Sequence, residues 1–151
     1  MTRRAMRVAV LASAGKDSAY AAWWAMMKGW EVECLVTVRV TGDDSMMFQL
    51  NGTAVAALQA ASMGVPWLPV LSGGEEELEV IELEAALRGH SDFQAAFVES
   101  WPDDWEKPEH LEIMVGAPDI DAIVVGALRS DYQKTRVDRM CERLGIISYS
   151  P

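Results

Sequence analysis

Apolar positions along the chain form short, continuous or alternating runs, separated by longer segments with helical periodicity. The runs predict strands at Arg7 to Ala12, Glu31 to Val40, Val65 to Leu71, Ala122 to Val125, and from Ile146. The periodic segments predict helices at Ser18 to Met27, Thr53 to Met63, Glu75 to Leu87, and Ser130 to Leu144. Strands that alternate with helices indicate an α/β protein, built on a parallel sheet with right-handed crossovers.

Two of these helices have unusual compositions. The first is apolar nearly all round, with its large side chains at Tyr20, Trp23, Trp24, Met26 and Met27. We therefore expect it to be well buried, with both tryptophans in the core rather than forming a ligand platform. The third begins with a run of glutamates, which we interpret as a solvated helix face.

The pattern weakens between Gly89 and Pro118. A short helix near Phe93–Trp101 and one or two helical turns from Glu109 to Val115 are the elements we expect there, around an acidic loop. This irregular insertion could be a lid, a contact surface, or a segment of no catalytic consequence.

Candidate chemistry lies where the first strand meets the first helix, in the stretch Ser13-Ala14-Gly15-Lys16-Asp17-Ser18. Unpaired backbone N–H groups and the helix dipole favour an anion there, Gly15 allows close approach of the main chain, and Lys16 adds a positive charge. The stretch lacks the spacing of the common P-loop and of Gly-x-Gly-x-x-Gly. We interpret it as a phosphate-binding turn.

A second turn, Gly126-Ala127-Leu128-Arg129, follows the fourth predicted strand, and Ser130-Asp131-Tyr132-Gln133 opens the last helix. In a parallel sheet the turns after both strands fall at the carboxyl edge, where ligands bind. A capping box alone accounts for Ser130 and Gln133, so a structural role is equally consistent with the pattern. Four cationic residues follow on the same helix, and a solvent-exposed helix face is enough to account for them: Lys134, Arg136, Arg139 and Arg143.

Composition narrows the class of protein. The chain has 151 residues and a net charge of −10, which fits one domain and argues against general nucleic-acid binding. Cys34 and Cys141 lie within apolar patterns, which predicts buried free thiols. No apolar run is long enough for a membrane span and we expect no signal peptide, so we expect a cytoplasmic protein.

Ser-x-Gly-Lys-Asp-Ser resembles the phosphate loop of the N-type ATP pyrophosphatases, with Ala14 in place of a glycine. The segments Val125–Val137 and Cys141–Gly145 are similar to the second signature of the diphthine–ammonia ligase family. Met47-Phe48-Gln49 is similar to the family's motif after the second strand, and Leu58–Pro66 fits its passage from helix to strand. The resemblance covers most of residues 7–151. It implies a Rossmann-like three-layer sandwich of the adenine nucleotide alpha hydrolase type, with a five-stranded, mostly parallel sheet.

The resemblance also implies an activity. Members of the family use ATP, with Mg²⁺, to adenylate the carboxylate of diphthine on elongation factor 2, and ammonia then displaces AMP. By the family pattern, the nucleotide would be bound by Ser13, Ala14, Gly15, Lys16, Asp17, Ser18, Thr37, Val38, Gly126, Ala127, Ser130, Asp131, Tyr132 and Gln133. Lys16, Asp17 and Arg136 would be catalytic. Asp17 is either a Mg²⁺ ligand or a helix cap.

Two departures from the family bear on this interpretation. Gln49 replaces a histidine, and family members continue past the fifth strand into a region thought to shape the acceptor pocket. We expect residues 1–151 to form a single ATP-binding domain without that region. The chain would be either a truncated ATP-binding half or a natural short form that a second chain or another subunit completes. An AMP-forming enzyme with another acceptor, a small carboxylate or tRNA, is an alternative. So is a non-catalytic ATP-binding module.

Overall fold

The structure is a computed structural model. It describes residues 5–11, 16–40, 57–72, 76–90, 101, 106–107, 109–114, 116–125 and 131–150. All structural statements below concern these residues.

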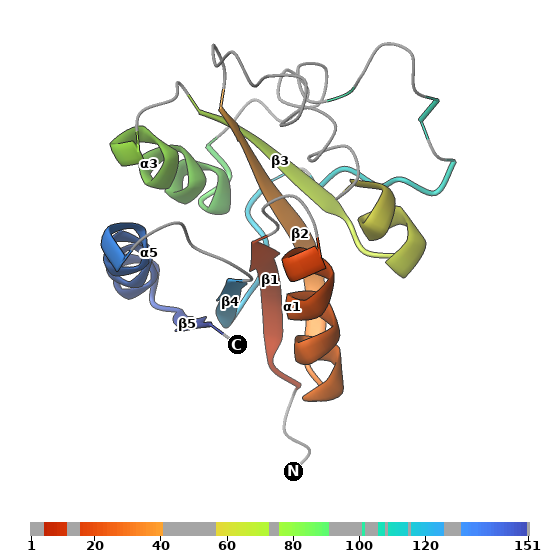
Figure 1. Cartoon of the computed structure of the whole chain (residues 1–151), viewed down its shortest axis with the longest axis horizontal. Helices are drawn as coiled ribbons and strands as arrows, with labels where there is room; N and C mark the ends of the chain where they lie inside the picture. The colour runs from red at the N-terminus through yellow and green to blue at the C-terminus, as the bar shows by residue number, and fades with distance from the viewer. Residues whose placement is uncertain are drawn as a thin grey trace.

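A five-stranded sheet forms the centre of the molecule, in the order β3-β2-β1-β4-β5 (Figure 1). Its strands are β1 (Arg7–Leu11), β2 (Glu31–Val40), β3 (Trp67–Ser72), β4 (Ala122–Val125) and β5 (Ile147–Tyr149). Every neighbouring pair is parallel. The predicted α/β, Rossmann-like fold is thus confirmed. The sheet is entirely parallel among its described strands rather than mostly so.

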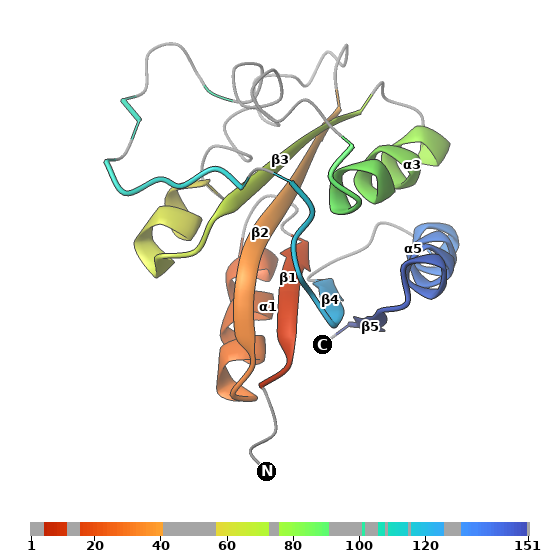
Figure 2. The same cartoon turned by 180° about the vertical axis from the view of Figure 1, so that it is seen from behind.

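Helices cover both faces of this sheet, so the fold has three layers (Figures 1 and 2). One face packs against α1 (Lys16–Met27) and the helical residues 57–63, and the other against α3 (Glu76–Leu87) and α5 (Asp131–Leu144). Successive side chains of β1 point to opposite faces of the sheet, so the strand contributes to both cores. Val8 and Val10 belong to the core under α1, and Ala9 belongs to the core under α3 and α5. These helices confirm the predicted ones within their described residues, and the glutamate-rich segment is helical, as expected.

The predicted burial of α1 is wrong for its largest side chains. The helix packs on the sheet through three buried alanines, Ala21, Ala22 and Ala25, which allow a close approach. Trp23 lies on the opposite face and is 55% exposed, and only Trp24 of the two tryptophans packs against the core. Because the small side chains of α1 face the sheet, most of its large side chains face solvent. A count of apolar residues does not distinguish these two faces. Gly29 ends the helix with φ +79°, as expected for a C-cap.

The helical turns predicted from Glu109 to Val115 are also wrong. Residues 109–110 form a turn, and residues 111–114 are not helical. Ile113 instead forms a parallel bridge with Trp67, the first residue of β3, at the outer edge of the sheet. The Trp67 N–H donates to the carbonyl of Glu112, and the Met114 N–H donates to the carbonyl of Trp67. Pairing with an open strand edge satisfies these backbone groups and competes with helix formation.

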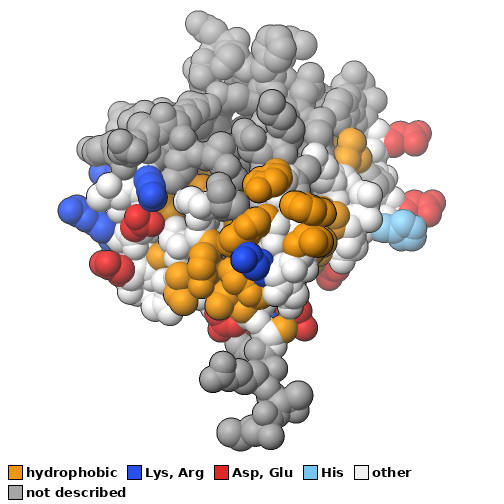
Figure 3. Space-filling model, turned by 60° about the horizontal axis from the view of Figure 1, so that its bottom comes forward, with side chains coloured by type: hydrophobic (Ala, Val, Ile, Leu, Met, Phe, Trp, Pro, Cys, Tyr) orange, Lys and Arg blue, Asp and Glu red, His pale blue; other side chains and the backbone are white. Residues whose placement is uncertain are grey.

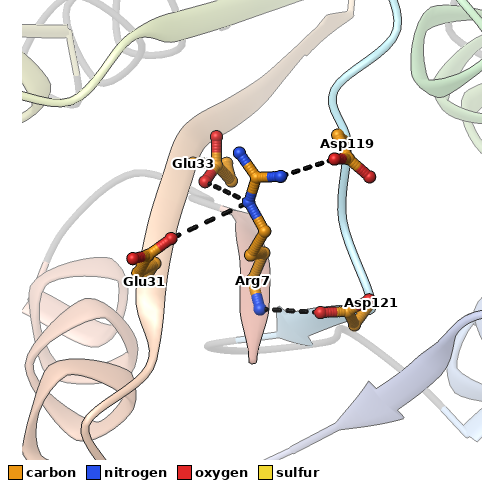
Figure 4. Close-up of polar contacts among 5 residues, drawn as sticks. All are labelled: Arg7, Glu31, Glu33, Asp119 and Asp121. Carbon is orange, nitrogen blue, oxygen red and sulfur yellow. Dashed lines mark hydrogen bonds and ion pairs between the residues drawn. The ribbon is translucent and has the colours of Figure 1, made fainter. Parts of the chain in front are cut away.

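Ion pairs join the amino ends of the strands. The Arg7 Nε, at the start of β1, donates to Glu33 on β2 (2.8 Å), and its Nη1 contacts Asp119 ahead of β4 (Figure 4). The backbone N–H of Arg7 donates to the Asp121 carboxylate (3.0 Å), and Glu31 lies 3.7 Å from the Arg7 Nε. The hydrogen bond with Glu33 raises the Arg7 pKa. This cluster is at the edge of the sheet opposite the strand ends that carry the candidate site.

Both cysteines of the chain lie among the described residues. Cys34 and Cys141 are both buried and free, which confirms the prediction. Within the described ranges, no helix has the length and apolarity needed to cross a membrane. The short helix expected near Phe93–Trp101 falls outside the described residues, except for Trp101.

Candidate active site

The candidate site begins where two neighbouring strands, β1 and β4, end side by side next to the longer strand β2. Leu11, the last residue of β1, pairs with Val36 of β2 on one side and with Val125, the last residue of β4, on the other. The chain therefore leaves β1 and β4 at one level of the sheet, as the sequence analysis expected. The strand order also changes direction here, because β2 and β3 lie on one side of β1 while β4 and β5 lie on the other. Such a switch point is where open parallel sheets bind ligands.

Two helices begin just beyond these strand ends. Lys16, Asp17 and Ser18 are the first three residues of α1, and Asp131, Tyr132 and Gln133 are the first three of α5. The start of α1 at Lys16, two residues earlier than predicted, places the lysine in the first helical turn. The two helices cover opposite faces of the sheet, and each begins five or six residues after the last residue of the strand before it. Each N-terminus offers free backbone N–H groups and a positive dipole end to an anion.

The third part of the candidate site is the carboxyl-terminal half of β2. Its ladder with β1 ends at Val36, whereas its ladder with β3 continues to Val40. Thr37 and Val38, the residues predicted to hold adenine, thus lie immediately beyond the end of the β1 ladder. They lie next to the switch point, and their contact with a nucleotide stays a prediction.

Thr37 is held firmly in this position. It is the buried polar residue of the described core, 1% exposed, and its Oγ1 accepts a hydrogen bond from the indole Nε1 of Trp67 (2.9 Å). Trp67 is fully buried, and its ring lies 6.3 Å from that of Trp101, measured between centroids. Sequence reasoning placed Trp67 in a strand but missed this bond. The only available signal was an indole N–H in an apolar run, which needs an acceptor when buried.

The cations of α5 have different environments. Arg136, predicted as catalytic, lies in the second turn of α5 and is half-buried. Lys134 and Arg139 are exposed. Arg143 is exposed as well, and it pairs with Glu84 of α3 (2.6 Å) at the far end of the helix. The arginine nearest the start of α5 is thus partly withdrawn from solvent, and Arg143 at the other end of the helix is exposed and pairs with α3.

Several predicted site residues lie outside the described residues: Ser13, Ala14, Gly15, Gly126, Ala127 and Ser130. The structure describes the backbone of Lys16, Asp17, Ser18, Asp131, Tyr132 and Gln133, but not their side chains. Within the described part of the chain, no group of three His, Cys, Asp or Glu side chains could hold a metal ion. A role of Asp17 in binding Mg²⁺ therefore stays a prediction.

Comparison with known proteins now bears on this geometry. The chain matches the diphthamide synthase N-terminal domain over residues 6–100 and 96–148. It belongs to this family. The match includes both turns, the end of β2 and Arg136, so the family assignment spans every part of the candidate site.

Curated relatives agree with the family. The chain is 31% identical to diphthine–ammonia ligase of Schizosaccharomyces pombe over 151 residues, which is 96% of this chain and 23% of that protein. It is 31% identical to the human diphthine–ammonia ligase over 150 residues, 93% of this chain and 51% of the relative. The zebrafish (Danio rerio) enzyme is 29% identical, with 92% and 52% coverage. The chain thus spans about half the length of the human and zebrafish relatives, and less of the yeast one.

Proposed function

We propose that this chain binds ATP at the switch point and activates a carboxylate as its acyl-adenylate for amidation by ammonia, the diphthine–ammonia ligase reaction. One observation carries the proposal. Leu11 and Val125 are paired, so the turns that lead to the helix starts at Lys16 and Asp131 leave the sheet at one point of its carboxyl edge. Membership of the diphthamide synthase N-terminal domain family supports a nucleotide at that point.

Adenine would bind at the carboxyl end of β2. Beyond Val36 the described ladder of β2 continues only on its β3 side, which leaves the β1 side of Thr37 and Val38 as the place for a base. Backbone N–H and C=O groups could then recognise the base edge. The Trp67–Thr37 hydrogen bond would fix the orientation of this part of the strand. Gly126 and Ala127 would admit the ribose or the α-phosphate, because small residues allow close approach.

The phosphates would lie between the two helix starts. Backbone N–H groups of the turn Ser13–Gly15 and the ammonium of Lys16 would neutralise the β- and γ-phosphates, while the hydroxyls of Ser13 and Ser18 donate to their oxygens. Ser130, Asp131, Tyr132 and Gln133 would face the α-phosphate side. Asp17, in the first turn of α1, would hold Mg²⁺, which supplies further charge neutralisation to the leaving pyrophosphate.

The chemistry then consists of two substitutions. A carboxylate oxygen of diphthine attacks the α-phosphorus, the bond from that phosphorus to the bridging oxygen breaks, and pyrophosphate leaves with the electron pair. The nitrogen of ammonia attacks the acyl carbon, the bond to AMP breaks, and a proton passes to solvent. Preorganised donors contribute most in the first step, where negative charge builds on the leaving group. Arg136 would stabilise the α-phosphate or orient the acceptor carboxylate.

The experiment that tests this proposal uses the chain with ATP, Mg²⁺, a diphthine-bearing elongation factor 2 and ¹⁵N-ammonium. We expect AMP and pyrophosphate as products, together with ¹⁵N in the modified histidine by mass spectrometry. Lys16→Ala is the matched control and should lose both signals.

Other outcomes point to other functions. ADP as the product would contradict the assignment of the reaction. AMP without labelled elongation factor would favour a different acceptor, such as a small carboxylate. Tight ATP binding without turnover would favour a non-catalytic nucleotide-binding module.

A further inference from the structure

The exposed face of α1 carries a row of large apolar side chains. We define the α1 stripe as Tyr20, Trp23, Met26 and Met27, which are 52, 55, 43 and 68% exposed. Tyr20, Trp23 and Met27 follow the i, i+3, i+7 spacing of a helix seam. Figure 3 shows an apolar area on this side of the molecule, with a basic side chain within it. Single exposed apolar residues need no explanation, but a continuous patch of this kind marks an interaction surface.

The patch does not stop at the helix. Trp24 packs edge-on against Trp30, with centroids 5.3 Å apart, and Trp30 lies 4.9 Å from the ring of Tyr149 on β5. The α1 stripe therefore borders an aromatic cluster that reaches the edge strand of the sheet. Rings that are fixed against one another lose little side-chain entropy when they are covered, which favours binding at such a surface.

The distribution of charge along the chain favours a second copy as the surface that covers the α1 stripe. The chain has 23 acidic residues and a net charge of −10, yet the one acidic residue of α1 is Asp17 in its first turn, and residues 18–28 have none. Two copies of so acidic a chain repel each other over most possible contacts. At the α1 stripe they bring no carboxylate of the helix against another, and Lys28, 5.4 Å above the ring of Trp24, adds a cation at its margin.

The stripe is also complementary to itself. Its aromatic residues, Tyr20 and Trp23, lie toward the start of the helix, and its methionines lie toward the end. A two-fold axis near Trp23 would set Tyr20 of one copy opposite Met27 of the other. Methionine sulfur makes favourable contacts with aromatic rings, and a two-fold contact uses the same patch twice.

We infer that the α1 stripe is the contact surface between two copies of this chain, with their α1 helices packed antiparallel. The exposed parts of its four side chains amount to an apolar area on the order of 300–400 Å² per copy. A specific interface buries about 800 Å² per partner, with an apolar core and a polar rim. The stripe is thus large enough for the core of such an interface.

Sedimentation of the whole chain at increasing concentration tests this inference. We expect a monomer–dimer equilibrium that tightens with added salt, because salt screens the repulsion between acidic copies. Met27→Glu should weaken the dimer by at least about tenfold, since it places a charge in the apolar core. Ile81→Glu is the matched control: Ile81 is 54% exposed on α3, on the other face of the sheet, and its variant should dimerise like the parent.

Cross-linking tests the antiparallel arrangement. Cys34 and Cys141 are buried, so an introduced surface thiol would be the reactive one. A mixture of Tyr20→Cys and Met27→Cys chains should form a disulfide between the two variants on mild oxidation, and neither variant alone should cross-link as well. A monomer at every concentration, or a dimer that Met27→Glu leaves intact, would overturn the inference. Cross-linking of each variant only with itself would overturn the antiparallel geometry.

Discussion

Leu11 and Val125 are paired residues of neighbouring parallel strands, and each is the last residue of its strand. This pairing brings two turns that are far apart in the sequence to one point of the sheet edge. The helices that follow these turns, α1 and α5, cover opposite faces of the sheet. We expect an anion bound between the two turns to be stabilised by the N-terminal dipole of each helix.

Nucleotide binding should depend on one residue from each helix. Lys16→Ala should raise the dissociation constant for ATP roughly 10- to 100-fold, the effect of losing a charge-assisted hydrogen bond. Arg136→Ala should have an effect of the same direction, because this half-buried arginine lies in the second turn of α5. Arg139→Ala removes an equal charge from an exposed position of the same helix and serves as the control. Calorimetric titration measures all three, and equal effects of the two arginine variants would argue against a specific role of Arg136.

The bond between Trp67 and Thr37 should show a measurable coupling energy. Thr37→Val removes the acceptor and Trp67→Phe removes the donor, so each should destabilise the fold by about 1–3 kcal/mol, with a further packing cost for the smaller ring. The double variant loses the same bond only once. We therefore expect its loss of stability to be about 1 kcal/mol smaller than the sum of the losses in the two single variants. Urea unfolding of the four proteins measures it. Strict additivity would mean that the 2.9 Å contact contributes nothing to stability.

Glu84 should make the contact between α3 and α5 sensitive to acid. Its Oε1 accepts from Nε and Nη2 of Arg143, at 2.9 and 2.6 Å, and Oε2 accepts from Arg88. The hydrogen bond and charge of Arg143, followed by the hydrogen bond and charge of Arg88, lower the Glu84 pKa. A lowered folded-state pKa means that the stabilisation is complete above the unfolded value of about 4.3 and is lost as the pH falls through the folded value.

Substitution of Glu84 provides the measurement. At pH 7, Glu84→Gln should lower the unfolding free energy by about 1 kcal/mol, a modest figure because the arginine partners are solvent-exposed. The difference from the parent should shrink as the pH is lowered below about 4. Glu142→Gln, at an exposed position of α5, makes the same change of charge and controls for net charge. A difference that stays constant down to the lowest pH would show that the ion pairs do not stabilise the fold.

Both thiols should be inert in the folded protein. Burial, together with the charge of Glu33, raises the pKa of Cys34 to about 12, and burial and Asp138 raise that of Cys141 to about 11. At pH 8 both thiols therefore stay protonated and should react with a disulfide reagent only after unfolding. Because the folded values exceed the unfolded value of about 8.5, their contribution to stability is present below that pH and declines above it. Rapid labelling of one thiol without denaturant would contradict its burial.

Periodicity was sufficient to predict the strands, the sheet edge and the helices of the described residues. It failed where burial depends on which face of a helix carries the small side chains. In α1 the alanines face the sheet, and the same apolar count would fit either orientation. Residues 111–114 are the second failure, because their pairing with Trp67 depends on an open strand edge that is distant in the sequence. The alternation of apolar residues placed Thr37 in a strand, but its bond to Trp67 required a known register between β2 and β3.

The central claim is that ATP binds where β1 and β4 end. Amide chemical-shift mapping of the ¹⁵N-labelled chain, titrated with Mg²⁺ and a non-hydrolysable α,β-methylene analogue of ATP, tests it most directly. We predict that the largest shifts fall on residues 12–18 and 126–133 and on Thr37 and Val38. Shifts concentrated instead around Arg7 and Asp119, at the opposite edge of the sheet, or an absence of shifts at saturating analogue, would contradict the claim.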